Sequence, residues 1–260
     1  MADRWSDQDI ARLHSLYPDL SKTPSQLEEV FGRKFCCIVA KAGKFGIRRP
    51  RPKAYEVDGH YLAVIDCPEK AYWLGFFAAD GGLVKRVMVQ FNLSGKDERL
   101  LRWMADQVAP DVAIKPRKDY PNMVYVQISD ENLAKSLREW GMGQGKSHSL
   151  VWPNKLPFAY NIPFIVGYFD GDGSLGYSSR DGAWNWEIVG PERFLKSVRD
   201  ILCDELGVVI PDPKPHSQSK QLYRLRTSGH QVIEIDDAFC KYGLGLARKR
   251  ISSHKDNPDH

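Results

Sequence analysis

The sequence predicts an α+β protein made of two similar α/β halves that follow a small all-α domain of three helices. Two apolar segments, 73–81 and 165–173, resemble each other, and each ends in aspartate followed by glycine. Alternating strand patterns follow both segments in the same order, which indicates an internal repeat. The first 53 residues differ in composition, with 11 basic and 6 acidic residues. We therefore predict domains at 1–53, 54–150 and 151–260.

Local signals place the first two helices of the small domain. Ser6 to Asp9 can cap a helix that runs through Leu16. The segment Thr23-Pro24-Ser25-Gln26 is a capping box with proline at the first helical position. Gly32 then ends this second helix, because glycine accepts the left-handed conformation that closes helices.

The third helix is predicted over residues 34–44 and is strongly basic. Ile38, Ala42 and Phe45 should face inward, and its lysines outward. Three short helices with a basic third one resemble a helix-turn-helix of the Myb or SANT type, which implies DNA contact; a small packed spacer is the alternative. The prolines of 48–53 predict an extended basic linker, either an arm in a minor groove or a hinge. The predicted DNA-binding residues here are Lys34, Lys41, Lys44, Arg48, Arg49 and Arg51.

The two apolar segments are predicted to pack against each other as buried helices. Each is apolar almost all round, which suits a helix inside a core. Small residues four apart, Gly75 with Ala79 and Gly167 with Gly171, would let the backbones approach closely. Their terminal aspartates, Asp80 and Asp172, would then meet. Because neighbouring carboxylates repel, we expect a hard cation such as Mg²⁺ between them.

The same order of elements is predicted in both halves: helix, hairpin, helix, hairpin, helix, with the apolar segment as the first helix. In the first half, a strand alternates over 86–94, a helix covers 97–108, a basic strand runs through Lys115, Arg117 and Lys118, a strand covers 124–129, and a helix covers 131–140. In the second half, a strand covers 184–188, a helix covers 192–206, and a strand covers 223–226 after a polar segment.

The open faces of these sheets carry residues suited to DNA. Basic groups bind phosphates, and amides or arginines reach base edges in the major groove. A solvated sheet face is the alternative for any single residue. The predicted DNA-contacting residues are Arg86, Gln90, Asn92, Lys115, Arg117, Tyr125, Gln127, Arg224 and Arg226.

The two segments resemble the nine-residue motif of the LAGLIDADG homing endonucleases, and the resemblance covers about residues 70 to 260. Glycine is kept at the third motif position and the metal-binding acid at the eighth. The first motif departs at the sixth position, where Ala78 stands against Asp170 of the second. The resemblance implies two pseudo-symmetric αββαββα repeats that form a DNA-binding saddle. It also implies a monomeric, site-specific, double-strand DNA endonuclease.

The same resemblance suggests residue roles. Asp80 and Asp172, with the backbone carbonyls of Ala79 and Gly171, would bind Mg²⁺, with Mn²⁺ or Ca²⁺ as substitutes in binding. A basic residue near each carboxylate would polarise the attacking water or stabilise the phosphorane charge. The candidates are Lys146 in the first half and Lys249 in the second, with Arg248 competing for the second place and a surface lysine as the alternative reading.

Composition narrows the other choices. The formal net charge is +4, which permits binding to nucleic acid. Five cysteines without a CxxC pair predict reduced core thiols and argue against a zinc site or disulfide framework. Without a signal peptide or transmembrane run we expect an intracellular protein with no membrane partner. The chain begins with Met1 and lacks intein-type ends, so a free-standing or intron-encoded protein is expected.

The alternative function is a catalytically inactive nucleic-acid-binding relative, such as an intron maturase or a transcription regulator.

Overall fold

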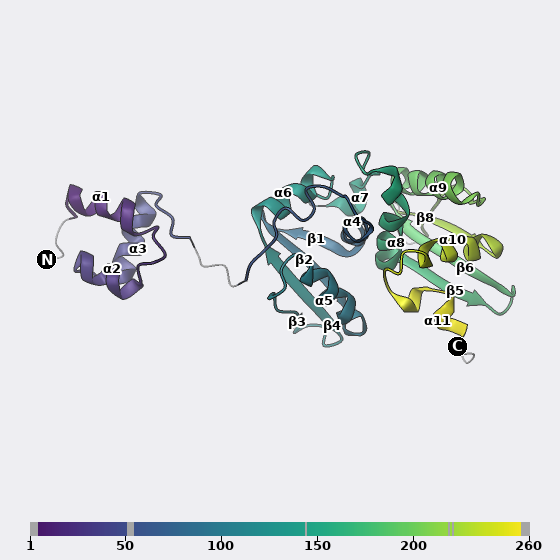
Figure 1. Ribbon diagram of the computed structural model, residues 1–260, viewed down its shortest axis with the longest axis horizontal. Helices are drawn as coiled ribbons and strands as arrows, with labels where there is room; N and C mark the ends of the chain where they lie inside the picture. The colour runs from purple at the N-terminus through teal and green to yellow at the C-terminus, as the bar shows by residue number, and fades with distance from the viewer. Residues whose placement is uncertain (1–4, 51–54, 144, 218, 220, 256–260) are drawn as a thin grey trace. The chain divides into compact units, whose positions relative to one another are not determined.

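The structure is a computed structural model that describes residues 5–50, 55–143, 145–217, 219 and 221–255. The chain divides into two compact units, Met1–Ala54 and Tyr55–His260, each with its own hydrophobic cluster. The ribbon is drawn in Figure 1.

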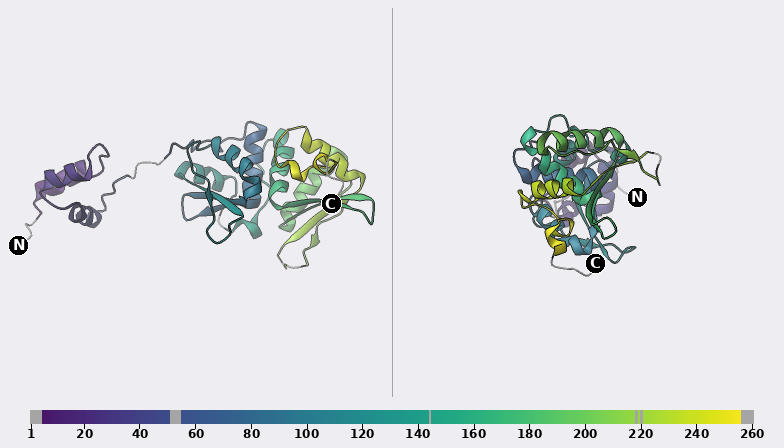
Figure 2. Two further views of the ribbon diagram at one scale, coloured as in Figure 1. Left: turned by 90° about the horizontal axis from the view of Figure 1, so that it is seen from below. Right: turned by 90° about the vertical axis from the view of Figure 1, so that its right-hand side faces the viewer.

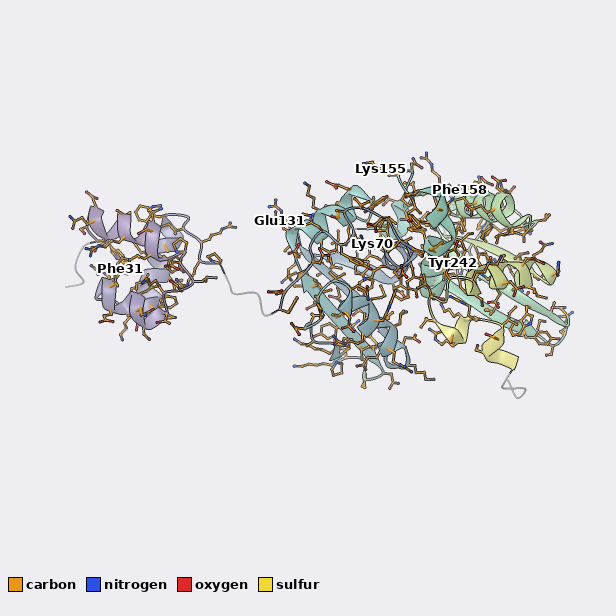
Figure 3. The ribbon with its side chains drawn as sticks, viewed as in Figure 1. Phe31, Lys70, Glu131, Lys155, Phe158 and Tyr242 are labelled. Atoms are coloured by element: carbon orange, nitrogen blue, oxygen red, sulfur yellow. The ribbon has the colours of Figure 1, made fainter. Side chains whose placement is uncertain are left out.

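The N-terminal unit contains three short helices, α1 (Asp7–Leu16), α2 (Pro24–Phe31) and α3 (Phe35–Lys44). Ser6 and Thr23 form capping boxes at the first two, and Gly32 ends α2 at φ 58°. Phe31 lies between the helices (Figure 3), within a core completed by Leu13, Tyr17, Leu27, Ile38 and Ala42.

The prediction that Phe45 faces the core of this unit is wrong. Phe45 follows α3, and its side chain is exposed. The ammonium of Lys41 lies over this ring, 5.1 Å from its centroid. The helical spacing of apolar residues predicted that the Phe45 ring faces the core, but the helix ends at Lys44. Ile47 packs against the core instead.

The second unit begins with α4 (Pro68–Asp80) and contains two four-stranded antiparallel sheets, which makes the fold α+β as predicted. The elements after α4 are β1 (Gly81–Val84), β2 (Met88–Ser94), α5 (Glu98–Asp106), β3 (Lys115–Pro116), β4 (Met123–Ser129), α6 (Glu131–Glu139) and α7 (Lys146–Ser149). The elements that follow are α8 (Asn161–Asp172), β5 (Gly173–Ser178), β6 (Ala183–Gly190), α9 (Glu192–Leu206), β7 (Lys214–Pro215), β8 (Tyr223–Ser228), α10 (His230–Cys240) and α11 (Ser252–Lys255). Short 3₁₀ turns precede α5, α8 and α11 at 95–97, 158–160 and 247–249.

The strand orders of the two sheets correspond: β1-β2-β4-β3 in one and β5-β6-β8-β7 in the other. In each sheet, buried residues alternate with partly exposed ones along the central strands, so that one face meets the core. Figure 2 shows the strands of both sheets gathered on one side of this unit and the helices on the other. Both sheets therefore present an open face on the same side.

Helices α4 and α8 pack along each other between the two sheets (Figure 1). A Cβ atom at Gly75 would overlap the carbonyl oxygen of Phe164, and one at Gly167 would overlap that of Tyr72. One at Gly171 would overlap the side chain of Ala79. At Gly75 and Gly167 the two backbones are thus so close that any side chain would force them apart.

Three details differ from the sequence-based expectations. Strand β2 begins at Met88, so Arg86 and Val87 lie in the turn after β1. Strand β3 ends at Pro116, which leaves Arg117 and Lys118 outside it. The cysteines are free thiols but not core residues: Cys36, Cys37 and Cys240 are exposed, and Cys67 and Cys203 are partly buried.

Among the described residues, no helix combines the length and apolar character that crossing a membrane requires.

Candidate functional site

The last residues of α4 and α8 are Asp80 and Asp172, and the helix packing brings them into one cluster. After each aspartate the chain leaves the helix in an extended conformation at glycine, Gly81 or Gly173. A Cβ atom at Gly171 would lie 3.3 Å from Oδ2 of Asp80, so the Asp80 carboxylate reaches the end of the other helix. Both aspartates keep solvent-exposed surface, so the cluster opens outward.

The surroundings make both carboxylates reluctant to ionise. Asp80 is exposed, but partial desolvation of its carboxyl group by neighbouring protein atoms, together with the charge of Asp172, raises its pKa to about 6. Burial likewise raises the pKa of Asp172, against the attraction of Lys146 and Lys249. Two carboxylates that repel each other in a partly desolvated place form a site that a cation would stabilise.

A buried lysine lies behind each aspartate. The Nζ of Lys146 donates to the carbonyl oxygens of Ala78 at 2.7 Å and Ala79 at 2.9 Å, and the side chain is 6% exposed. These carbonyls belong to the last turn of α4, where helical carbonyls lack partners within the helix. Burial lowers the pKa of Lys146 to about 8, although Asp172 and Asp80 oppose the shift.

Lys249, not Arg248, occupies the corresponding place in the second half. Four carbonyl oxygens lie within hydrogen-bond distance of its Nζ and share its three N–H groups: those of Phe169 (3.2 Å), Asp170 (2.7 Å), Gly171 (3.2 Å) and Gly173 (2.7 Å). Burial lowers its pKa as well. The carbonyls of Ala79 and Gly171, predicted as metal ligands, therefore each accept a lysine hydrogen bond, which leaves one lone pair on each oxygen.

The two lysines act electrostatically across the cluster. Lys146 is the strongest attractive charge on Asp172, and Lys249 is the strongest on Asp80. Within the part of the chain that the structure describes, no three His, Cys, Asp or Glu residues gather into a metal site. The oxygen donors available here are two carboxylates and main-chain carbonyls, a set that suits a hard cation completed by water and phosphate.

Sequence reasoning missed a buried ion pair beside this cluster. Arg250 Nη1 lies 3.0 Å from Oδ1 of Asp170, and both side chains are nearly inaccessible. Tyr72 of α4 also donates its hydroxyl hydrogen to Asp170, at 2.9 Å. An aspartate inside an apolar helix indicates that a hydrogen-bond donor or a cation lies beside it in the fold. The sequence offers many basic residues, however, and does not say which one folds back.

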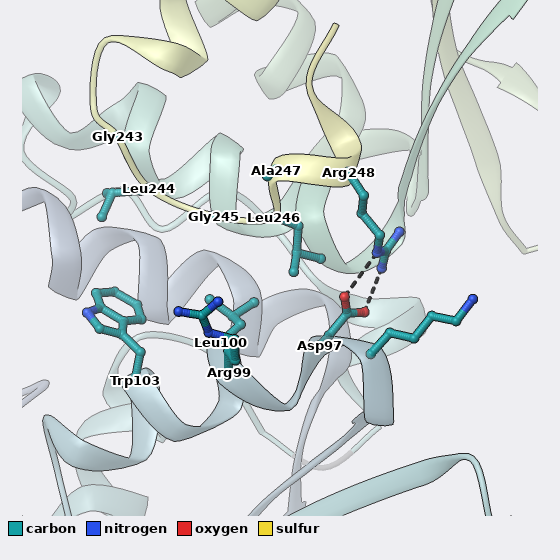
Figure 4. Close-up of a pocket in the computed structure, with 11 residues that line it drawn as sticks. Asp97, Arg99, Leu100, Trp103, Gly243, Leu244, Gly245, Leu246, Ala247 and Arg248 are labelled. Carbon is teal, nitrogen blue, oxygen red and sulfur yellow. Dashed lines mark hydrogen bonds and ion pairs between the residues drawn. The ribbon is translucent and has the colours of Figure 1, made fainter. Parts of the chain in front are cut away.

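A cavity of about 480 Å³ separates α5 from the segment 243–248 (Figure 4). The Asp97–Arg248 ion pair crosses one end of it, with the Arg248 Nη2 atom 2.7 Å from Asp97 Oδ2. Trp103, Leu100, Leu244 and Leu246 line the rest. Arg248 is therefore paired with the 3₁₀ turn before α5, which explains why it does not take the place of Lys249.

Five of the predicted DNA-contacting residues of the first half lie together on the first sheet. Gln90 is paired with Gln127 across β2 and β4, Asn92 with Tyr125, and Tyr125 with Lys115. Gln127 Nε2 donates to Gln90 Oε1 at 2.7 Å, and Gln90 Nε2 donates to Asn92 Oδ1 at 3.1 Å. This amide chain fixes which end of each side chain offers donors and which offers acceptors.

Two of the predicted residues lie away from that row. Arg86 is exposed in the turn between β1 and β2. Arg117 follows β3, with its guanidinium 4.9 Å from the centroid of the Tyr120 ring.

The second sheet places Arg224 and Arg226 on β8, where they alternate with the buried Leu225. Arg226 is opposite Glu187 in register and donates from Nη2 to Asn185 Oδ1 at 2.8 Å. Lys214 of β7 is opposite Arg224. The open face of this sheet is therefore basic, with one carboxylate, Glu187, beside the arginine.

The basic residues of the N-terminal unit differ in availability. Lys34, Lys44 and Arg48 are exposed. Lys41 is half-buried over the rings of Trp5 and Phe45, and Arg49 is half-buried and donates to the carbonyls of Tyr17 and Lys22. Arg51 lies outside the described residues. The side chains of Lys41 and Arg49 are therefore engaged within this unit.

No family model and no curated protein matches this sequence. Solved structures with a similar fold include the K262A mutant of I-SmaMI, with a TM-score of 0.51 and 15% identity over 73% of this chain and 89% of that one. They also include the LAGLIDADG homing endonuclease I-SmaMI bound to cleaved DNA (0.50, 16%, 73% and 87%). The homing endonuclease I-WcaI bound to its DNA recognition sequence is another (0.50, 9%, 70% and 84%). At these identities, the likeness establishes the fold.

Proposed function

We propose that this protein is a metal-dependent, site-specific endonuclease that cuts both strands of a DNA duplex. The observation that carries the proposal is the meeting of Asp80 and Asp172 at the ends of two closely packed helices, with a buried lysine behind each. The fold is that of DNA-bound homing endonucleases, and two polar sheet faces lie on one side of the unit.

The proposed arrangement is a single-chain saddle with a pseudo-two-fold axis between α4 and α8. The corresponding strand orders and the matched aspartates and lysines support two αββαββα repeats. One chain then supplies both carboxylates, so that a monomer suffices to cut both strands. We also assign the N-terminal unit as a helix-turn-helix that extends the contact with DNA through Lys34, Lys44 and Arg48.

The donor set at the helix ends fits Mg²⁺. Asp80 and Asp172 would hold the ion, with Mn²⁺ or Ca²⁺ as substitutes, and the carbonyls of Ala79 and Gly171 have a lone pair left for it. When bound, Mg²⁺ lowers the pKa of a water and neutralises charge on a phosphate.

The chain's own residues do the rest. The sheet faces bind and orient the duplex so that a phosphate lies over each aspartate. The ammonium of Lys146, with a pKa of about 8, is protonated at neutral pH and can donate from Nζ toward charge that develops on the phosphate oxygens.

Asp80→Asn and Asp172→Asn test the assignment. Each removes a negative charge but keeps the side-chain shape, so we expect DNA binding to persist and double-strand cutting to fall by roughly 10³-fold or more. The substrate is a pool of random-sequence duplexes incubated with Mg²⁺, from which cut ends are selected and sequenced. Binding is then measured on the selected site with Ca²⁺.

Two outcomes would contradict the proposal. If both variants cut like the wild type, the site assignment is wrong. If the wild type shifts duplex DNA but gives no cut ends with Mg²⁺ or Mn²⁺, the chain is a binding protein on this fold.

A further inference from the structure

We propose that Asp170 and Arg250 are positioning residues that hold Lys249 in place and have no such effect on Lys146. The lysine that assists the cutting of one DNA strand is then held more firmly than the lysine that assists the cutting of the other. The effect on DNA cutting rests on the proposed function, whereas the claim that the ion pair holds Lys249 does not. It is carried by a difference between the two halves of the second unit.

The Asp170–Arg250 pair fixes the segment that ends at Lys249. Arg250 Nη1 donates to the carbonyl of Lys249 at 2.9 Å, and Nη2 donates to that of Leu244 at 3.2 Å. Asp170 Oδ2 accepts the backbone N–H of Leu246 at 2.8 Å. One buried ion pair thus holds the segment at its start, middle and end.

The segment fits closely around the pair. Gly245 has φ +97°, and a Cβ atom there would overlap Asp170 Oδ2 and approach Arg250 Nη2 to 2.6 Å. Further along, Asp236 Oδ2 accepts the N–H of Ile251 at 3.1 Å. Because Arg250 donates to the main-chain carbonyl of Lys249, the Lys249 side chain has little freedom to move its Nζ away from the carbonyls at the end of α8.

Among the residues that the structure describes, the first half has no counterpart of these contacts. The place of Asp170 in the motif is taken by Ala78, and serine, not arginine, follows Lys146 in the sequence. Gly143, which corresponds to Gly245 in the glycine-rich segment, has no atom within 4 Å of a potential Cβ. Within the described part of the chain, two carbonyl oxygens lie within hydrogen-bond distance of Lys146 Nζ, and four lie within that distance of Lys249 Nζ.

The pair also joins the two halves, because the Tyr72 hydroxyl of α4 donates to Asp170 of α8. A buried ion pair adds little net stability over apolar packing, but it does demand a particular geometry. The geometry that it fixes here is that of the Lys249 segment against both central helices.

The first test needs neither DNA nor metal. The full-length protein is treated with a limiting amount of acetic anhydride, and the acetylation rates of individual lysines are read by mass spectrometry. We expect Lys249 and Lys146 to be protected in the wild type. Asp170→Asn and Arg250→Lys should raise the rate at Lys249 by about tenfold or more and leave Lys146 unchanged, because only one segment is released.

Matched variants separate positioning from general destabilisation. Arg102 is a comparable arginine, because it joins the carboxylate of Asp106 to the carbonyls of Pro110 and Val112. Arg102→Lys should change the acetylation rate of neither Lys146 nor Lys249. Tyr72→Phe removes one donor to Asp170, and should raise the Lys249 rate less than Asp170→Asn does. If Asp170→Asn fails to fold, Arg250→Lys and Tyr72→Phe decide the question. Equal rises at both lysines, or no rise at Lys249, would overturn the inference.

The second test follows the two strands of a selected target labelled at opposite 5′ ends. Arg250→Lys should slow the cutting of one strand by about tenfold or more and spare the other, so that a strand-specific nick accumulates. The spared strand reports folding and binding within the same molecule. Equal slowing of both strands would refute the inference. A wild type that cuts nothing would refute the proposed function instead, while the acetylation result would still stand.

Discussion

Asp80 shows how a single residue joins stability to the proposed chemistry. Its carboxyl group lies among protein atoms beside a second carboxylate, and its pKa is about 6 instead of its ordinary value of 3.8. A carboxyl group with a raised pKa binds its proton more tightly in the folded state than in the unfolded state. Its ionisation therefore destabilises the metal-free protein as pH rises between about 4 and 6.

This predicts a pH signature. From pH 4 to 6, the Tm of the metal-free wild type should fall relative to that of Asp80→Asn, because the amide cannot ionise. Above pH 6, Mg²⁺ should raise the Tm of the wild type more than that of the variant, since the ionised carboxylate binds the ion. Differential scanning fluorimetry across pH, with EDTA and with Mg²⁺, measures both effects. A constant difference in Tm across this range would contradict the prediction.

At the same scale, the sequence could propose Asp80, Asp172, Lys146 and Lys249 because each occurs at a repeated place in a repeated pattern. It could not choose between Arg248 and Lys249. Arg248 is committed to Asp97, which lies far away in the sequence on the turn before α5. It also could not find Arg250 or Tyr72, because their partner, Asp170, is distant in sequence from both.

Among the helices and strands, the contact between α4 and α8 matters most for the candidate site. The two helices owe their spacing to glycines that lie against backbone atoms of the opposite helix, Gly75 against Phe164 and Gly167 against Tyr72. The same contact brings the terminal carboxylates together. A change in helix spacing should therefore affect both stability and the site.

Gly167→Ala is expected to lower the free energy of unfolding by about 1–3 kcal/mol, because the added methyl group forces two backbones apart. Chemical denaturation followed by tryptophan fluorescence measures the loss. Gly176→Ala is the matched control: this glycine lies in β5 with open space around it, and its substitution should cost far less. Equal effects of the two substitutions would mean that the helix contact tolerates more spacing than the structure indicates.

The elements differ in how well the sequence predicted them. Long elements with strong signals were placed within a residue or two, such as α9 (Glu192–Leu206) and β4 (Met123–Ser129). Weak elements were not. The two-residue strand β3 has no alternation of its own and exists only because it pairs with β4. The turn at Arg86 and Val87 interrupts an alternation that would otherwise continue, since hydrogen bonding to β1 begins only at Met88.

At the scale of the whole molecule, the two compact units have separate hydrophobic clusters. The sequence changes in charge near residue 53, since basic residues without an acid between them crowd the segment 33–53. It could not tell which of those basic groups are free. Arg49 and Lys41 are used inside the N-terminal unit, whereas Lys34, Lys44 and Arg48 are exposed.

This separation predicts what removing the N-terminal unit does. A chain of residues 55–260 should keep its fold, because its core contains no residue of the first unit. It should bind random-sequence duplex DNA more weakly, and log Kd should depend less steeply on log salt concentration, by about 0.9 for each phosphate that the first unit neutralises. Circular dichroism checks the fold, and fluorescence anisotropy at several salt concentrations gives the slope.

The full chain with Lys34→Gln, Lys44→Gln and Arg48→Gln serves as the matched variant. If these exposed residues bind the phosphates, the triple variant should approach the salt slope of the truncated chain while keeping the first unit folded. A double variant at Lys41 and Arg49 should instead lower the stability of that unit, because both side chains contact its rings and carbonyls. An unchanged salt slope in the triple variant and in the truncated chain would mean that the first unit does not touch DNA. Its three helices would then be a packed spacer, and the sheet faces of the second unit would account for all of the binding.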